Sequence, residues 1–247
     1  MSSLDLEVFC KSTTDPTVYP SCFAPHGDIT YLQWLLQAWG WTLSVALTGL
    51  VIALVIGLVV GVMRTLPNKA VAFIGEAWTE MFRNVPLVVQ LLIWFHVVPA
   101  LVPALAHVPE FLLASLGLGF FTSARIAQQV KAGINTIPTG QRYAGLACGF
   151  TLAQTYRYVL LPVALRTVLP TLTSESMNII KNSSVASAVN ISELIFFAGQ
   201  AGEETSMHMT MYAAVTILYF ISAFSINRLA ALVERRTRLP GAVGGAR

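Results

Sequence analysis

Charge is scarce in this chain: only 11% of its 247 residues are charged, whereas 55% are hydrophobic. Soluble domains carry about 25% charged residues, so this sequence cannot cover a water-soluble surface. The apolar residues gather in runs long enough to cross a hydrocarbon core of about 30 Å, which takes roughly 20 helical residues. The composition therefore excludes a soluble globular protein and predicts a membrane protein.

Motifs that carry chemistry are also missing. The sequence contains no G-x-x-x-x-G-K-[ST] phosphate loop, nucleophile elbow, H-E-x-x-H or Asp-x-Asp motif. Its 4 histidines are scattered, so no Cys/His cluster has the spacing of metal ligands. We therefore expect no catalytic residue, no metal site and no cofactor in this chain. Its net charge of +3 says little about nucleic acid, because basic patches in a multi-span protein are first of all orientation signals, and no nucleic-acid partner is expected.

Five apolar stretches are predicted to span the bilayer, at about residues 34–63, 70–98, 111–132, 172–197 and 209–232. Helices are expected because a spanning backbone finds no hydrogen-bond partners in lipid. The predicted fold class is an all-α membrane protein with five transmembrane helices. It has an amino-terminal arm over residues 1–33, a transmembrane domain over 34–232 and a tail over 233–247. No charged stretch followed by an apolar run precedes residue 34, so no cleaved signal peptide is expected.

Basic residues gather after the first and third predicted spans and in the tail. They are Arg64, Lys69, Lys131, Arg142, Arg157, Arg166, Arg235, Arg236, Arg238 and Arg247. The opposite segments carry Lys11 against the acidic residues Asp5, Glu7, Asp15, Asp28, Glu110, Glu203 and Glu204. By the positive-inside rule, the amino terminus is predicted outside and the carboxyl terminus in the cytoplasm.

Two of the 3 cysteines, Cys10 and Cys22, then lie on the outer, oxidising side. They close a short loop if they form a disulfide; the alternative is a mobile segment with free thiols. Cys148 is predicted on the cytoplasmic side, as a small packing residue.

The loop over residues 137–170 has the pattern of a short helix, a glycine break, a second short helix and a proline stop. Gly149 can adopt the positive φ that ends a helix, and Thr151 with Gln154 has the form of a capping box. A compact, basic helical hairpin outside the bilayer indicates contact with a partner. The alternative is an amphipathic hairpin on the membrane surface, with arginines at the lipid phosphates.

This loop resembles the EAA loop of permease subunits from bacterial ABC importers. The family glycine matches Gly149 and the distal Leu-Pro matches Leu161 and Pro162, whereas the Glu-Ala-Ala start reads Tyr143-Ala144-Gly145. The missing glutamate removes the partner contact that this carboxylate would make.

The resemblance covers about residues 31–240 and is strongest to the polar amino-acid branch of the family. Its marks are FRNVPLVVQ at residues 82–90, IPTGQ at 137–141, YRYVLLP at 156–162 and KNSSVAS at 181–187. Within that branch, RYAG at 142–145 and VERRTRLPG at 233–241 are most similar to glutamate/aspartate permeases.

The resemblance implies a type I ABC importer permease fold and ATP-driven uptake of glutamate or aspartate across the bacterial inner membrane. It also implies two ATPase subunits that use ATP and Mg²⁺, a second permease subunit (identical or a sister) and a periplasmic solute-binding protein, which would land near residues 99–110 and 199–207. The residues implied in docking the ATPase are Gln141, Arg142, Tyr143, Ala144, Gly145, Ala147, Gly149, Leu161 and Pro162. The alternatives are a permease for another polar amino acid and an ion-coupled secondary transporter subunit.

Polar residues inside predicted spans are candidates for the substrate path, because lipid rejects them. Glu175, Asn178 and Asn182 share one face of the fourth span, with Lys181 beside them. The third span repeats the pattern with Arg125, Gln128 and Gln129. Cations facing a cavity suit a substrate with carboxylates. The structural alternative is an internal pair of Glu175 with Lys181 or Arg125.

Arg83, in the second span, can pair with Glu76 or Glu80 on its own helix. Pro86 is expected to kink that span shortly afterwards. The combination fits a structural anchor better than a hinge or gate.

Overall fold

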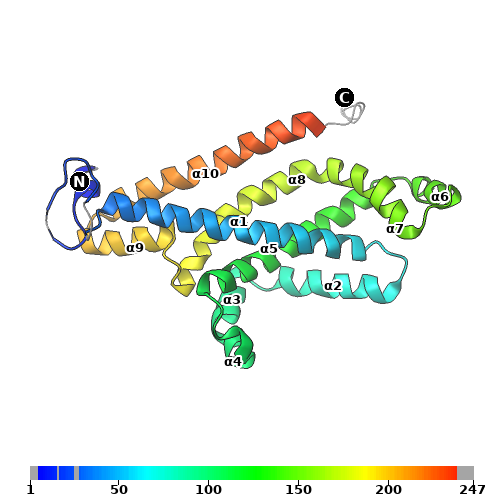
Figure 1. The fold of residues 1–247 in the computed structure, drawn as a ribbon, viewed down its shortest axis with the longest axis horizontal. Coiled ribbons are helices and arrows are strands. Elements are labelled where there is room, and N and C mark those ends of the chain that lie inside the picture. The colour runs from blue at the N-terminus through cyan, green and yellow to red at the C-terminus, as the bar shows by residue number, and fades with distance from the viewer. Residues whose placement is uncertain (1–4, 16, 25–27, 238–247) are drawn as a thin grey trace. The chain divides into compact units, whose positions relative to one another are not determined.

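The computed structural model describes residues 5–15, 17–24 and 28–237, with the side chains described up to residue 232. Regular structure in these ranges is helical (Figure 1). The α-helices are α1 (Tyr31–Met63), α2 (Lys69–Asn84), α3 (Leu87–Leu92), α4 (Val98–Leu101), α5 (Glu110–Asn135), α6 (Thr139–Ala147), α7 (Leu152–Thr155), α8 (Leu161–Asn182), α9 (Leu194–Thr205) and α10 (His208–Thr237). Short 3-10 helices cover Glu7–Cys10, Pro103–Leu105 and Ser183–Val189, and π-helical turns cover Ile93–Val97 and Tyr156–Leu160.

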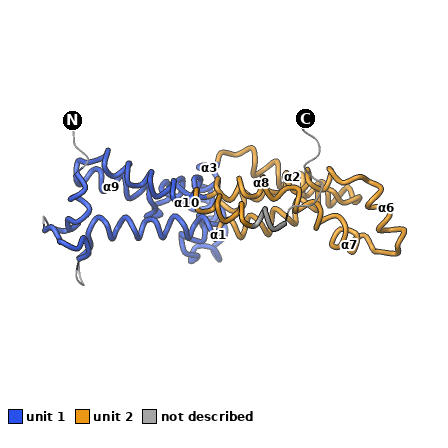
Figure 2. The backbone as a smooth tube through the Cα atoms, turned by 90° about the horizontal axis from the view of Figure 1, so that it is seen from above, with its two compact units in different colours: residues 1–48, 87–117, 180–223 blue, residues 49–86, 118–179, 224–247 orange. Residues whose placement is uncertain are grey.

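The chain divides into two compact units, and most long helices contribute to both (Figure 2). The first unit comprises Met1–Thr48, Leu87–Gly117 and Ile180–Ala223. The second comprises Gly49–Pro86, Leu118–Ile179 and Phe224–Arg247.

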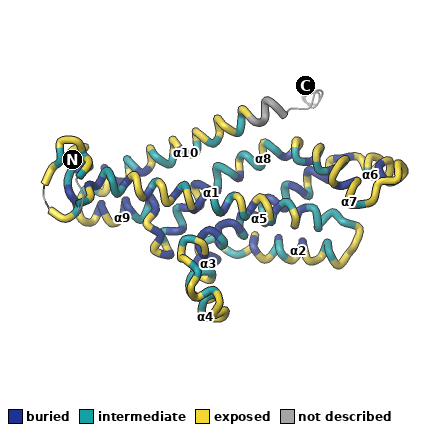
Figure 3. Tube along the Cα trace, viewed as in Figure 1, coloured by how far each residue is buried: buried dark blue, intermediate teal, exposed yellow. Residues whose placement is uncertain are grey.

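The core of the first unit lies between the amino-terminal half of α1, helix α9 and the start of α10 (Figure 3). Leu35 of α1 and Met211 of α10 are buried there with Phe197 of α9, whose ring also meets the ring of Trp34 edge-on at 5.1 Å. Val8 of the arm joins this core and is only 1% exposed. The arm is therefore packed against the helices by apolar contact.

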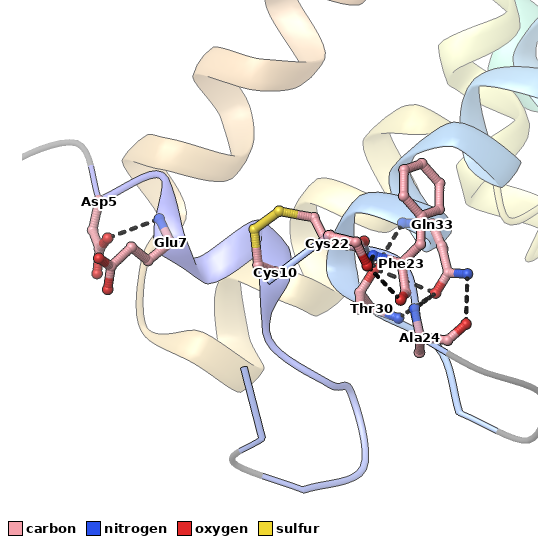
Figure 4. The surroundings of a disulfide bond; sticks show 9 residues. Asp5, Glu7, Cys10, Cys22, Phe23, Ala24, Thr30 and Gln33 are labelled. Atoms are coloured by element: carbon pink, nitrogen blue, oxygen red, sulfur yellow. Dashed lines mark hydrogen bonds between the residues drawn. A yellow bond between two sulfur atoms is a disulfide. The ribbon is translucent and has the colours of Figure 1, made fainter. Parts of the chain in front are cut away.

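The structure joins Cys10 to Cys22 in a disulfide that ties the arm together (Figure 4). The hydroxyl of Thr30 donates to the Cys22 carbonyl at 2.7 Å, which links the bridge to the start of α1. Farther along the arm, the Asp28 carboxylate accepts hydrogen bonds from the hydroxyls of Ser12, Thr14 and Tyr19, at 2.7–2.8 Å. The segment predicted to be an arm is thus a cross-linked cap.

This set of hydrogen bonds predicts how the cap responds to pH. The hydroxyls of Ser12, then Thr14 and Tyr19, lower the pKa of the Asp28 carboxyl to about 2. Because the folded pKa lies below the unfolded value of about 3.9, the stabilisation is complete above about pH 4 and is lost as the pH falls through about 2. We expect the rate at which a phosphine reduces the Cys10–Cys22 bridge, relative to its rate with a small-molecule disulfide at the same pH, to stay flat down to about pH 4 and to rise below it.

Asp28→Asn supplies the control for that measurement. The asparagine amide has one acceptor oxygen in place of the two carboxylate oxygens that the three hydroxyls use. The disulfide of this variant should therefore be reduced faster than that of wild type at neutral pH, with no further rise in acid. A wild-type reduction rate that climbs already between pH 7 and 5 would contradict the assignment to Asp28.

Close packing in the second unit joins α1 to α5. A Cβ placed on Gly57 of α1 would lie 2.7 Å from the side chain of Ile126, and one placed on Gly119 of α5 would lie 2.7 Å from Ile52. Small residues let helix backbones approach closely where lipid supplies no hydrophobic drive for association.

The structure confirms the first, third and fifth predicted spans as long apolar helices: α1, α5 and residues His208–Leu232 of α10 qualify by length and hydropathy. The second predicted span is broken, since the helical pair Lys69–Asn84 and Leu87–Leu101 bends by 103°. Pro86 lies at the break, where its missing N–H and its ring prevent a continuous helix. The total of five spans therefore stays a prediction.

The fourth span, predicted over residues 172–197, is wrong in its boundaries. Helix α8 begins at Leu161 and ends at Asn182; a 3-10 helix follows and stops at Asn190, which has a left-handed φ of 59°. Ser183 and Ser184 bond back to carbonyls three residues earlier, which competes with a regular α-helix. Glu193 then caps a new helix, α9.

The proline stop predicted for the 137–170 loop is also wrong. Pro162 is the second residue of α8 and Pro170 lies inside it. Pro162 lies just beyond the π-helical turn Tyr156–Leu160, in which the backbone bonding is already shifted to i→i−5 partners, so the N–H that the proline lacks falls where the regular α-helical bonding is interrupted. The helix continues through Pro170 while packed on α5, where Val168 lies directly on Gly133.

Candidate functional site

The segment from α6 to α7 forms a helical hairpin at one end of the second unit (Figure 1). Gly149 ends α6 with a φ of 85°, as its position in the sequence predicts. Thr151 and Gln154 form the predicted capping box, with the Gln154 N–H donating to Thr151 Oγ1 at 3.2 Å and the Thr151 N–H donating to Gln154 Oε1 at 2.8 Å. Two local signals thus set the turn between the helices.

The hairpin exposes an apolar tip. Tyr143 and Leu146 of α6 are 68% and 38% exposed, and Phe150 and Tyr158 beyond the turn are 41% and 61% exposed. The Arg157 guanidinium lies 5.7 Å from the centre of the Tyr158 ring. Aromatic residues with a neighbouring arginine are typical of residues that anchor protein interfaces.

Two residues of this hairpin, Gly145 and Cys148, differ from expectation. Gly145 is buried, and a Cβ there would lie 2.9 Å from the side chain of Thr155, so this glycine permits contact between α6 and the end of α7 instead of contact with a partner. Cys148 is exposed and free, so it is not a packing residue. Most of the other predicted docking residues are exposed, as expected for a contact surface. They are Gln141, Tyr143, Ala144, Ala147, Gly149 and Pro162, whereas Arg142 and Leu161 are half-buried.

The base of the hairpin is held to the membrane helices. Tyr156, 5% exposed, donates its hydroxyl to the Thr65 carbonyl just beyond α1, at 2.7 Å. It belongs to a buried cluster with Val130 and Ile134 of α5 and Ala164 of α8. The tip therefore projects from a firmly packed base, which suits a part that transmits force.

A polar cluster joins α5 to α8 in the second unit. Arg125 Nε lies 2.9 Å from Glu175 Oε2, and Arg125 Nη2 donates to Glu175 Oε1 at 3.1 Å. Gln129 Nε2 donates to the same oxygen at 3.1 Å. The Glu175 side chain is 6% exposed, whereas that of Arg125 is 41% exposed. Of the pairings left open by the sequence, the structure shows Glu175 with Arg125, and the guanidinium keeps an accessible side.

Among the described side chains, the other predicted path residues take no part in this cluster. Gln128 of α5 and Asn178 of α8 are half-buried in the second unit. Lys181 is exposed and Asn182 half-buried, and both belong to the first unit. Each unit therefore carries part of the predicted path.

A second ionic cluster was not predicted from the sequence. Arg64 after α1 binds the Glu76 carboxylate of α2 with two hydrogen bonds of 2.8 Å, and Lys131 of α5 donates to the same carboxylate at 3.0 Å. Glu76 therefore pairs with Arg64 and Lys131 and not with Arg83. Arg83 pairs with Glu80 at 2.9 Å, which is one of the two pairings that the sequence left open. No periodicity relates Glu76 to Lys131, so only the assembled fold could reveal this cluster.

The two segments predicted to meet a solute-binding protein have different structures. Residues 99–110 include the end of α4 and the turn Pro103–Leu105, with Leu101 76% exposed. Residues 199–207 were expected to form a loop, but α9 continues to Thr205 and is followed by Ser206, which has a left-handed φ of 55°. Glu203 and Glu204 are exposed on that helix, and Glu204 accepts a hydrogen bond from Tyr31 at 3.0 Å.

Among the described residues, no group of three Cys, His, Asp or Glu side chains could hold a metal ion. Arg238 and Arg247 lie outside the described residues, as do residues 238–241 of the VERRTRLPG motif and the side chains of the rest of that motif, including Arg235 and Arg236.

Comparison with known proteins identifies the family. A family model described as "Binding-protein-dependent transport system inner membrane component" matches residues 35–239. The chain belongs to this family. It is accordingly an integral inner-membrane permease subunit and not an enzyme. The resemblance to polar amino-acid ABC permeases found in the sequence is thereby confirmed.

Individual relatives cover most of the permease. Glutamate/aspartate import permease protein GltJ of Escherichia coli (strain K12) is 39% identical over 232 residues, which cover 90% of this chain and 94% of the relative. Probable glutamine ABC transporter permease protein GlnM of Bacillus subtilis (strain 168) is 29% identical over 195 residues, 79% of this chain and 89% of the relative.

A solved structure agrees with these relatives. It is described as the crystal structure of an amino acid ABC transporter with histidines, and it superposes with a TM-score of 0.72 at 27% identity, covering 83% of the permease and 95% of that chain. The predicted ABC importer permease fold is confirmed.

Proposed function

We propose that this permease passes glutamate or aspartate inward across the bacterial inner membrane, driven by ATP hydrolysis in two partner ATPase subunits. The observation that carries the substrate class is Arg125, a cation on spanning helix α5 that keeps 41% of its side chain exposed while paired with Glu175. A partly exposed guanidinium inside a span is costly unless it serves a polar path, and its fork-shaped donors match a carboxylate. The 39% identity to a glutamate/aspartate permease supports the same substrate.

In this proposal the α6–α7 hairpin is the coupling element. Its apolar tip, centred on Tyr143 and Leu146, docks on an ATPase subunit, and its packed base at Tyr156 carries the motion to α1 and α5. ATP and Mg²⁺ act in the ATPases, and this chain needs no cofactor. ATP binding draws the hairpins together and opens the path outward, and hydrolysis resets it.

The proposed complex includes a second permease subunit, identical or a sister, and a periplasmic solute-binding protein. The amino terminus faces the periplasm and the carboxyl terminus the cytoplasm. The Cys10–Cys22 disulfide supports this orientation, because disulfides persist in the oxidising periplasm. The basic residues after α1 and α5 support it from the other side.

The test is ATP hydrolysis by the complex reconstituted in liposomes, with purified solute-binding protein and a panel of amino acids. We expect stimulation by glutamate and aspartate, and only when the binding protein is present. Stimulation by basic or neutral amino acids instead would overturn the acidic substrate while keeping the importer mechanism. A permease that never co-purifies with an ATPase would overturn the coupling role of the hairpin.

A further inference from the structure

The second unit contains a cavity of about 170 Å³ where the membrane helices meet the coupling hairpin. Its polar lining comes from Thr65 after α1, Asn135 at the end of α5, and Thr139 and Arg142 of α6. Apolar residues, among them Ile137 and Leu160, form the rest of its wall. The cavity thus offers hydrogen-bond donors beside a hydrocarbon surface.

Within the part of the chain that the structure describes, no hydrogen bond or ion pair engages the Arg142 side chain. Its Nε is shielded from solvent and has no hydrogen-bond partner among the described residues. No carboxylate with a described side chain lies within ion-pair distance of its guanidinium, although Arg64, Arg83 and Arg125 each have one. A shielded N–H without an acceptor is unfavourable, so Arg142 favours a ligand that brings an acceptor oxygen to this position, and its positive charge favours an anionic one.

The remaining donors suit an oxyanion with several acceptor oxygens. Thr139 contributes a hydroxyl and Asn135 an amide, whereas the nearby Tyr156 hydroxyl is already used by the Thr65 carbonyl at 2.7 Å. Arginine with hydroxyl and amide donors is a common arrangement around phosphate. The cavity also lies against the first turn of α6, whose partial positive charge favours an anion.

The position of the cavity indicates where the phosphate comes from. Helix α1 ends at Met63 and α5 at Asn135, and spanning helices end at the level of the lipid headgroups. We propose that this cavity binds the phosphate of an anionic membrane phospholipid through Arg142, and that the bound lipid holds the base of the coupling hairpin at the membrane surface. The site depends on the membrane location of the chain and on no particular transported substrate.

The experiment measures how much phosphatidylglycerol stays bound to the purified permease complex, by native mass spectrometry after exchange from vesicles of phosphatidylglycerol and phosphatidylcholine. Arg142→Gln should retain about tenfold less phosphatidylglycerol, the size of a lost charge-assisted contact. Arg157→Gln is the matched control, since it removes the same charge from an exposed residue of the same hairpin, and it should bind lipid as wild type does. Thr139→Val, which leaves every charge in place, should show a smaller loss.

Several results would overturn the proposal. Equal losses in Arg142→Gln and Arg157→Gln would indicate nonspecific charge attraction. Displacement of the lipid by inorganic phosphate alone would assign the cavity to a soluble anion. Retention by the permease freed of ATPase, with none in the full complex, would assign the cavity to a partner carboxylate. ATPase co-purification is recorded on the same samples, so failure of docking with lipid retained would count against the proposed function and leave the lipid site standing.

Discussion

Replacing Tyr143 and Leu146 together by aspartate should abolish co-purification of the ATPase subunits while the permease still inserts in the membrane. Both side chains are exposed on α6, so the change buries no charge within this chain. Interface anchors contribute about 2 kcal/mol each, and losing two would weaken docking by roughly a thousandfold. The measurement is the ratio of ATPase to permease after affinity purification, with transport assayed in parallel.

Leu6→Asp is the matched control for this variant. Leu6 is an apolar residue of the arm that is 70% exposed, so it tests whether an added surface charge alone disturbs the complex. We expect an unchanged subunit ratio. A complex that survives the Tyr143 and Leu146 changes would refute docking through the hairpin tip. If the aspartate variant fails to insert, the milder pair Tyr143→Ala and Leu146→Ala replaces it, and the same loss of co-purification is expected.

Neutralising Arg125 and Glu175 separates a structural pair from a substrate site. Arg125→Gln leaves the Glu175 carboxylate shielded, with Gln129 as its remaining partner. Breaking a buried pair costs about 3–5 kcal/mol, and we expect about 2–3 kcal/mol here because Arg125 is partly exposed. The double variant Arg125→Gln with Glu175→Gln should regain most of the stability, since no unpaired charge remains. It should still transport glutamate at least about tenfold more slowly, for lack of the cation.

The matched control is the double change Arg83→Gln with Glu80→Gln. This pair has exposed side chains, at 42% and 43%, and a surface pair contributes at most about 1 kcal/mol. Its stability and transport should stay near wild type. Wild-type transport by the stable Arg125 and Glu175 double variant would mean that the pair only holds α5 to α8, and the substrate path would have to be sought elsewhere.

Local signals predicted the hairpin well and its continuation poorly. The turn at Gly149 and the Thr151 capping box depend on residues close together in sequence, and both formed as expected. The prolines led to a wrong prediction of where the helix stops. Helix α8 continues through Pro170 while Val168 packs on Gly133 of α5, and no local sequence pattern records that contact. The same limitation produced the wrong fourth span, where apolar content continued past the end of helix α8.

The sequence by itself determined the membrane class, the family, the hairpin turn and the pairing candidates of the polar residues. Composition, short spacings and shared motifs can all be read along the chain without knowing how its helices pack. Only the tertiary structure decided which candidates meet. It paired Glu175 with Arg125, engaged Glu76 with Arg64 and Lys131, turned Gly145 inward and left Arg142 facing a cavity. Such outcomes depend on how separate helices pack, and charges distant in sequence find partners only when packing brings them within a few ångströms.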